Sequence, residues 1–146
     1  MGIFTSSILG ISLLASPLTA NASESVEGPE VTLVNESALT LDNGLGARAS
    51  SGKGRIEGSN PIGLKPRASA STIMNSGTGL VVKAKVNSNN NGTSTSTSGW
   101  SSLRNTNKVS TPNLVALTEK TTFFGEHELK KTKTSSWEEA KTSISF

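Results

Sequence analysis

The sequence Leu80-Val81-Val82-Lys83-Ala84-Lys85-Val86 alternates small apolar residues with two lysines over its second half. Side chains that alternate with a period of two point to opposite faces of a β-strand. The segment therefore predicts a strand with one buried face and one basic face.

Further strands are expected on both sides of this segment. Residues 71–74 form a short run that ends in an Asn-Ser-Gly turn, and residues 30–34 and 37–41 read as two strands around a turn at Asn35-Glu36. Residues 114–117 and 121–124 are expected to pair with each other. Between these runs, residues 44–66 are rich in Gly, Ser and basic residues, which predicts a loop.

Two segments are expected to lie outside the sheet. Residues 87–99 are built from Asn, Gly, Ser and Thr, a composition typical of a flexible linker or long loop. Ser135 and Ser136 are each followed three residues later by a glutamate, which resembles a capping box and predicts a short helix over residues 137–141. The expected fold is mainly β: a small antiparallel sheet or sandwich with long polar, partly disordered loops and at most one short C-terminal helix.

Composition predicts a thin hydrophobic core. Only 33% of the 146 residues are hydrophobic and 4% are aromatic, and the chain contains no cysteine that could form a disulfide. Stability must therefore come from sheet pairing, a partner or a metal, or parts of the chain must stay unfolded.

The N-terminal 22 residues predict an export signal. Residues 3–18 carry no charge, the apolar centre is shorter than a membrane span, and Ala20-Asn21-Ala22 supplies the small residues of a cleavage site. We expect cleavage after Ala22 and a secreted location: extracellular, cell-surface or periplasmic. The expected organisation is a signal peptide at 1–22, a β-rich segment with basic loops at 23–86, a linker or loop at 87–99, and a C-terminal segment at 100–146 that belongs to the same small domain.

The net charge of +3 is unevenly distributed along the chain. Residues 23–42 contain only acidic charges, whereas residues 43–108 contain nine basic residues and a single acid, Glu57. If the basic residues converge on one face, that face could bind an anionic polymer. The candidate polyanion-binding residues are Arg48, Lys53, Arg55, Lys65, Arg67, Lys83 and Lys85.

No motif predicts catalysis, a metal or a cofactor. Residues 44–49 fit a loose dinucleotide-binding pattern, but Ser50-Ser51-Gly52 opposes the helix that this pattern requires. The single histidine, His127, has no partner at metal-ligand spacing and is expected in a solvent-exposed turn.

The sequence indicates a small secreted or cell-surface interaction protein, acting in adhesion, in a matrix or on a host, and not an enzyme. Its expected partner is a protein, an anionic polysaccharide or another surface; specific nucleic-acid binding and a membrane span after signal removal are not expected. Asn35 and Asn91 open N-glycosylation sequons. Two alternatives remain open: a secreted hydrolase that uses a serine and His127, and a precursor cut at basic sites near residues 65–67 or 130–131.

Overall fold

The structure is a computed structural model that describes residues 30–41 and 50–146. The chain divides into Met1–Val31 and Thr32–Phe146, and the second unit contains nearly all of the described residues. The expected export segment and Arg48 lie outside them. In the described part of the chain, no helix has the length and apolar character needed to cross a membrane.

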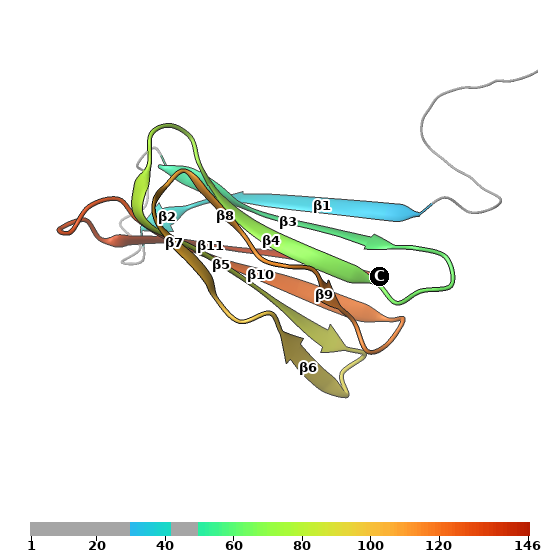
Figure 1. Cartoon of the computed structure of the whole chain (residues 1–146). Coiled ribbons are helices and arrows are strands. Elements are labelled where there is room, and N and C mark those ends of the chain that lie inside the picture. Colours follow the sequence, from blue (N-terminus) through green and yellow to red (C-terminus); the bar gives the residue numbers. More distant parts are fainter. Residues whose placement is uncertain (1–29, 42–49) are drawn as a thin grey trace, which may run out of the picture. The chain divides into compact units, whose positions relative to one another are not determined.

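Thr32–Phe146 folds into two antiparallel sheets, and no helix occurs among the described residues (Figure 1). The expected mainly-β fold is therefore confirmed. The five-stranded sheet has the order β1-β3-β4-β8, with β9 also paired to β4; its strands are β1 (Val31–Ala38), β3 (Gly52–Asn60), β4 (Arg67–Met74), β8 (Lys108–Ser110) and β9 (Leu114–Val115). The six-stranded sheet has the order β2-β11-β10-β5-β6, with β7 also paired to β5; its strands are β2 (Thr40–Leu41), β5 (Gly79–Asn90), β6 (Ser94–Thr97), β7 (Ser101–Thr106), β10 (Thr121–Lys130) and β11 (Trp137–Ser145).

The inward faces of the two sheets share one hydrophobic core. In β5 the expected pattern is confirmed, because Val82, Ala84 and Val86 are fully buried while the two lysines between them lie on the other face. Both sheets contribute residues to this core, as a sandwich requires. Its other buried members are Leu39, Ile56, Ala68, Ala70, Met74, Val109, Ala116, Phe123, Leu129, Ala140 and Ile144.

β3 occupies a segment that was expected to be a loop, so that prediction was wrong over Gly52–Asn60. The strand alternates as a sheet requires, but glycine fills three of its buried inward positions: Gly52, Gly54 and Gly58. A Cβ atom at Gly54 would collide with the His127 ring, and one at Gly58 would lie 2.5 Å from Ile144 Cδ1. At Gly54 and Gly58, close approach of the opposite sheet therefore explains why glycine replaces the apolar residues that would have revealed the strand.

β1 is one continuous strand, and the expected turn at Asn35-Glu36 is absent. The chain passes instead from one sheet to the other at Leu39, between the end of β1 and the start of β2. The Leu39 side chain is fully buried, and its amide donates a hydrogen bond to the Gly52 carbonyl at 2.9 Å. β2 then pairs with β11, so this crossing links the two sheets along one side.

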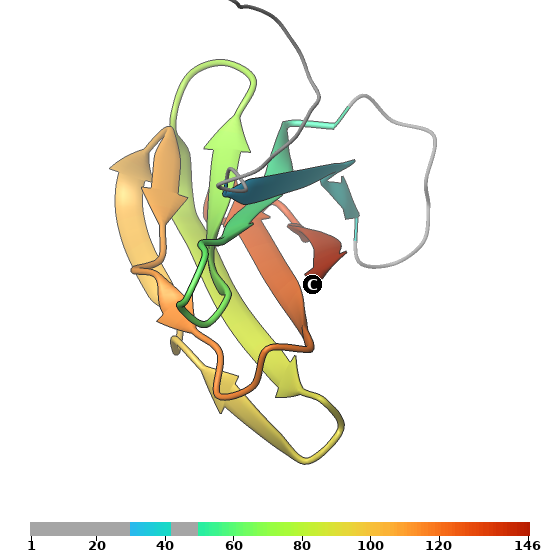
Figure 2. The ribbon, with the colours of Figure 1, turned by 90° about the vertical axis from the view of Figure 1, so that its right-hand side faces the viewer.

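The expected linker at 87–99 is also largely strand. β5 continues to Asn90, and β6 returns beside it after a turn at Asn91-Gly92 in which both residues have positive φ, 54° and 74°. Figure 2 shows β5 running between this turn and the β4–β5 turn at the opposite end. Asn90 is fully buried; its Nδ2 donates to the Ser94 carbonyl at 3.3 Å, and its Oδ1 accepts from the Leu117 amide at 2.8 Å. Polar side chains therefore hold this hairpin in place where apolar side chains are missing.

The C-terminal strands differ from the expectation in two ways. β9 pairs with β4, whereas β10 pairs with β5 and β11, so residues 114–117 and 121–124 do not pair with each other. The expected helix at 137–141 is the start of β11, whose even-numbered residues from Glu138 to Ile144 are buried with a period of two. The Ser135 hydroxyl accepts from the Lys131 and Thr132 amides at 3.1 and 2.9 Å, so it closes the β10–β11 turn and caps no helix.

Candidate functional site

The structure separates the candidate polyanion-binding residues into two groups. Lys53 and Arg55 of β3 and Arg67 of β4 lie on the outer face of the five-stranded sheet, and Lys65 lies in the exposed loop before β4. The remaining described members, Lys83 and Lys85, lie on the outer face of the six-stranded sheet. The two groups are therefore on opposite sides of the sandwich and do not form one surface.

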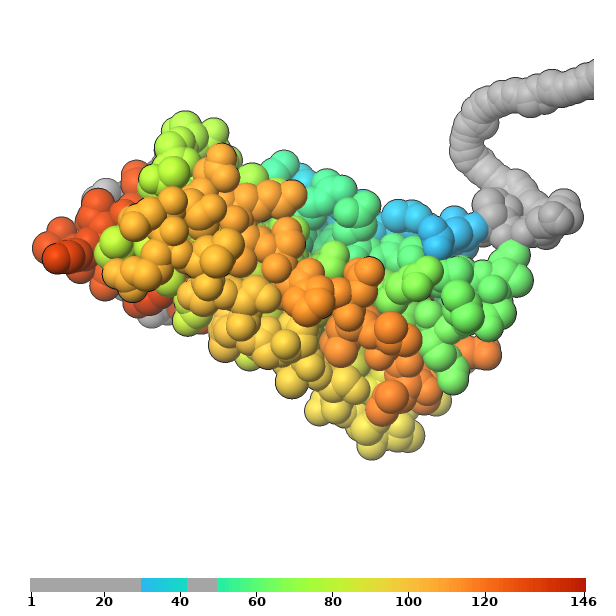
Figure 3. Space-filling view, viewed as in Figure 1, coloured from blue at the N-terminus to red at the C-terminus, as the bar shows by residue number. Residues whose placement is uncertain are grey.

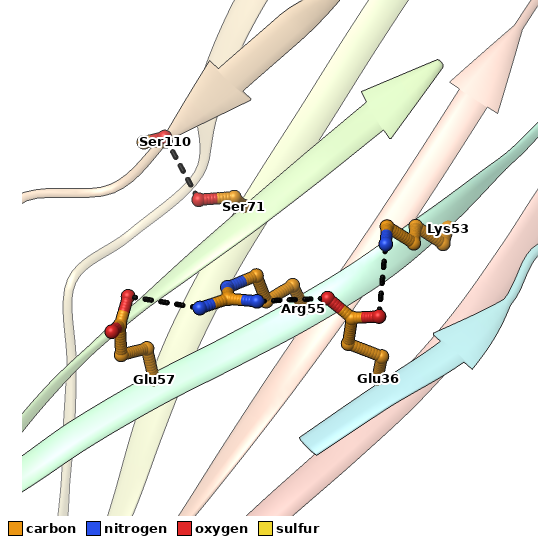
Figure 4. Close-up of polar contacts among 6 residues, drawn as sticks. All are labelled: Glu36, Lys53, Arg55, Glu57, Ser71 and Ser110. Carbon is orange, nitrogen blue, oxygen red and sulfur yellow. Dashed lines mark hydrogen bonds and ion pairs between the residues drawn. The ribbon is translucent and has the colours of Figure 1, made fainter. Parts of the chain in front are cut away.

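On the five-stranded sheet, Lys53 and Arg55 are compensated by carboxylates, whereas Arg67 makes no ion pair with a carboxylate of the described residues. Glu36 of β1 accepts from Lys53 Nζ and Arg55 Nη1, both at 2.9 Å, and Arg55 Nη2 lies 3.5 Å from Glu57 (Figure 4). Hydrogen bonds from Lys53 and then Arg55 lower the pKa of Glu36. Farther along this face, the hydroxyl groups of Ser71 and Ser110 form a hydrogen bond at 2.8 Å (Figure 4).

On the six-stranded sheet, β5 and β10 carry a ladder of ion pairs. Lys83 lies opposite Glu128 and Lys85 opposite Glu126, and the Nζ to Oε1 distance is 2.7 Å in both pairs. Opposite charges on directly paired residues stabilise an antiparallel sheet. These two lysines therefore also have carboxylate partners.

Both tryptophans of the chain lie against Lys83. Lys83 Nζ lies 4.6 Å from the centroid of the Trp100 ring and 5.1 Å from that of Trp137, and Lys85 Nζ lies 4.8 Å from the Trp100 centroid. A cation–π contact of this kind contributes about 0.5–1 kcal/mol at an exposed site. The two indole rings are thus fixed on the outer face of the sheet by a shared ammonium group.

A break between β6 and β7 positions Trp100. Ser98 exchanges hydrogen bonds with Val86: its amide donates to the carbonyl at 2.9 Å, and its hydroxyl accepts from the amide at 3.1 Å. Gly99 follows with a φ of 74°, a conformation that favours glycine. The chain then resumes pairing with β5 at Ser101, which leaves Trp100 beside the β5 lysines.

One end of this outer face is cationic. Arg104 of β7, Val81 of β5, Lys130 of β10 and Trp137 of β11 form one row of directly paired residues across the sheet. The β10–β11 turn that follows adds exposed Lys131 and Lys133 and protrudes at this end (Figure 3). We call Arg104, Lys130, Lys131 and Lys133 the cationic end; none of them makes an ion pair with a carboxylate of the described residues.

Sequence reasoning missed this cluster. The signal was present, because Lys130, Lys131 and Lys133 are nearly consecutive and Trp137 follows closely. In the sequence these lysines do not stand out, because glutamates are interspersed with lysines after residue 108. Only the sheet order shows that the balancing glutamates of β10 pair with lysines of β5 instead.

His127 is buried between the sheets, so its expected position in an exposed turn was wrong. It lies on an inward position of β10, 1% exposed, above Gly54 of β3. Thr72 Oγ1 donates to the Lys83 carbonyl at 2.7 Å and so accepts from the His127 Nδ1–H at 3.1 Å; Nε2 then accepts from Thr142 Oγ1 at 2.9 Å. This hydrogen-bond pattern assigns a neutral imidazole with its proton on Nδ1.

Burial explains the protonation state of this histidine. Desolvation lowers the pKa of His127 to about 4, while a hydrogen bond with the Ser71 backbone and the charge of Glu126 oppose the shift more weakly. Neutral His127 therefore joins β4, β10 and β11 as a structural residue.

The two sequons lie at accessible positions. Asn35 is exposed on β1, where its Oδ1 accepts from the Ser143 amide at 3.3 Å, and Asn91 is exposed in the β5–β6 turn. Their glycosylation stays a prediction.

No group of three or more His, Asp or Glu side chains that could hold a metal occurs within residues 30–41 and 50–146. Comparisons with protein-family models, curated proteins and solved structures give no match.

Proposed function

We propose that this protein is an exported, non-enzymatic binding protein that holds an anionic polymer, such as an acidic surface polysaccharide, through the cationic end of the six-stranded sheet. The observation that carries the proposal is the gathering of Arg104, Lys130, Lys131 and Lys133 in one row and its adjoining turn, where none of them makes an ion pair with a described carboxylate. Neighbouring strands are about 4.8 Å apart, so Arg104 and Lys130, two strands apart, can contact successive charges of one polymer chain.

Charge compensation favours this end over the basic middle of the sequence. Lys53, Arg55, Lys83 and Lys85 all have a carboxylate oxygen at 2.9 Å or less. A polyanion would have to displace those carboxylates before it could gain the same contacts. The cationic end requires no such exchange.

The buried environment of His127 disfavours the hydrolase alternative. A serine nucleophile would have to lie beside His127, whereas the side-chain partners of the ring are the hydroxyls of Thr72 and Thr142 in a buried site. The precursor alternative is also disfavoured near residues 65–67, because Pro66 is buried and Arg67 begins β4.

Heparin chromatography at increasing salt tests the proposal. We expect the wild-type protein to bind at low salt and the triple variant Lys130→Glu, Lys131→Glu, Lys133→Glu to elute at clearly lower salt, since screening weakens exposed charges over about 8 Å at physiological ionic strength.

A matched control separates position from net charge. Lys65→Glu, Lys108→Glu, Lys120→Glu makes the same charge change at three exposed lysines elsewhere and should elute close to the wild type. Equal shifts in the two triple variants, or wild-type protein that flows through at low salt, would refute the proposed site.

A further inference from the structure

The indole ring of Trp100 is an exposed aromatic surface with a fixed support. The ring is held against two ammonium groups of β5, Lys83 at 4.6 Å and Lys85 at 4.8 Å from its centroid, and Trp100 is still 40% exposed. A ring that is already immobilised loses little conformational freedom when a ligand stacks on it. Trp137 lies against the same Lys83 ammonium, so a second ring is available nearby.

The polar groups around Trp100 are paired charges of both signs. Lys83 and Lys85 each lie 2.7 Å from a glutamate, Glu128 and Glu126. A phosphate chain over Trp100 would meet these two carboxylates, and their repulsion would offset the attraction of the lysines. Sugar hydroxyls meet no such penalty, because each can donate to a carboxylate and accept from an ammonium.

The electrostatics of the aromatic ring also favour a sugar. The face of an indole ring carries negative charge density, and the C–H groups on the face of a pyranose ring are weakly positive. The row of hydroxyls around the sugar then lies at the level of the charged side chains of the sheet.

We propose that Trp100, with Lys83, Lys85 and Glu126, forms a stacking site for an uncharged pyranose unit of a polysaccharide that continues toward the cationic end. This inference rests on the proposed function only in taking the outer face of the six-stranded sheet as the contact surface. It adds the class of unit that this face selects: a sugar ring in preference to a nucleotide base.

Fluorescence titration with neutral hexasaccharides, cellohexaose and chitohexaose, tests the site. We expect at least one of them to change the tryptophan emission of the full protein, with an affinity that stays constant from low to physiological salt. Trp100→Ala should weaken this binding about tenfold or more, while Trp100→Tyr, which keeps an aromatic face, should retain most of it.

Three controls make the outcomes distinct. Phe124→Ala removes another exposed aromatic ring from the same face and should leave hexasaccharide binding unchanged. The Lys130, Lys131, Lys133 triple variant should lose heparin retention and keep hexasaccharide binding, so failure of the two proposals can be told apart. The stacking site is refuted if neither hexasaccharide binds, if Phe124→Ala costs as much as Trp100→Ala, or if a thymidine oligonucleotide alone binds in a Trp100-dependent way.

Discussion

Two glycines make room for a buried imidazole. A Cβ atom at Gly54 would collide with His127 Cδ2, and one at Gly125 would collide with Thr142 Oγ1. Gly54→Ala should therefore destabilise the protein by about 1–3 kcal/mol, because the added methyl overpacks a closed site. Urea denaturation of the variant measures this loss.

A double-mutant cycle checks the cause. Removing the ring with His127→Ala opens the space that the new methyl group needs, so Gly54→Ala should cost less in that background than in the wild type. Equal costs in both backgrounds would show that the backbone, and not the imidazole, requires glycine.

His127 also makes stability depend on pH. Its pKa is about 4 in the folded protein and 6.5 when unperturbed, so below pH 6.5 the unfolded chain binds a proton that the folded chain does not. The free energy of unfolding is therefore unaffected by the titration of this histidine above pH 6.5. As pH falls from 6.5 toward 4, this free energy decreases by about 1.4 kcal/mol per pH unit. Because the chain has one histidine, a single imidazole NMR signal reports the native pKa directly. A signal that titrates near 6.5 while the protein is folded would contradict the buried network.

At the level of elements, hydrogen bonding decides where the hairpin of β5 and β6 ends. Asn90 binds Ser94 and Ser96 of β6 through Nδ2 and the Leu117 amide through Oδ1. Asn90→Ala should therefore speed hydrogen exchange of the β6 amides and of Leu117, with a loss of about 1–3 kcal/mol for the buried groups left unpaired. Asn87→Ala, which removes only an outward side chain bound to Glu126, should leave that exchange nearly unchanged. Similar protection in the two variants would exclude this role for Asn90.

Strands with apolar inward residues could be predicted from the sequence, and strands with glycine or polar inward residues could not. β5 follows the first rule through Val82, Ala84 and Val86. β3 uses Gly54 at an inward position, and β5 continues through buried Ser88 and Asn90, where burial leaves no apolar pattern to read. In these strands the inward residues can be buried only because the opposite sheet fills the space beside a glycine or a neighbouring loop offers a hydrogen-bond partner.

At the level of the whole molecule, the sequence predicts how much charge the protein carries but not which charged residues share a surface. Alternation correctly placed Lys83 and Lys85 on one face of their strand. Alternation could not predict that Lys53 and Arg55 belong to the other sheet. It also could not predict that Glu36 pairs with these two residues or that Glu128 pairs with Lys83. The cationic end could be recognised only after strand order had paired the remaining charges.

The expected export signal can be tested at the N-terminus of the mature protein. If residues 1–22 are a cleaved signal, mass spectrometry of the protein recovered outside the producing cell should give a mature N-terminus at Ser23. An intact Met1, or cleavage at another position, would contradict the predicted processing site. Replacing Ala20 and Ala22 with bulky residues should retain the precursor, because the signal peptidase pocket requires small side chains.

The pairing of β2 with β11 has a consequence for when the protein can fold. The Thr40 hydroxyl donates to the Glu139 carbonyl at 3.4 Å across 99 positions, and the two strands are paired at this point. Contacts between such distant residues form late and slow the folding rate, because the intervening chain must be ordered first. A ribosome that has released only the first hundred residues holds a chain that lacks β10 and β11 and cannot complete its six-stranded sheet. Such a chain cannot fold completely before its last strands are synthesised, which would keep it competent for translocation if residues 1–22 act as an export signal.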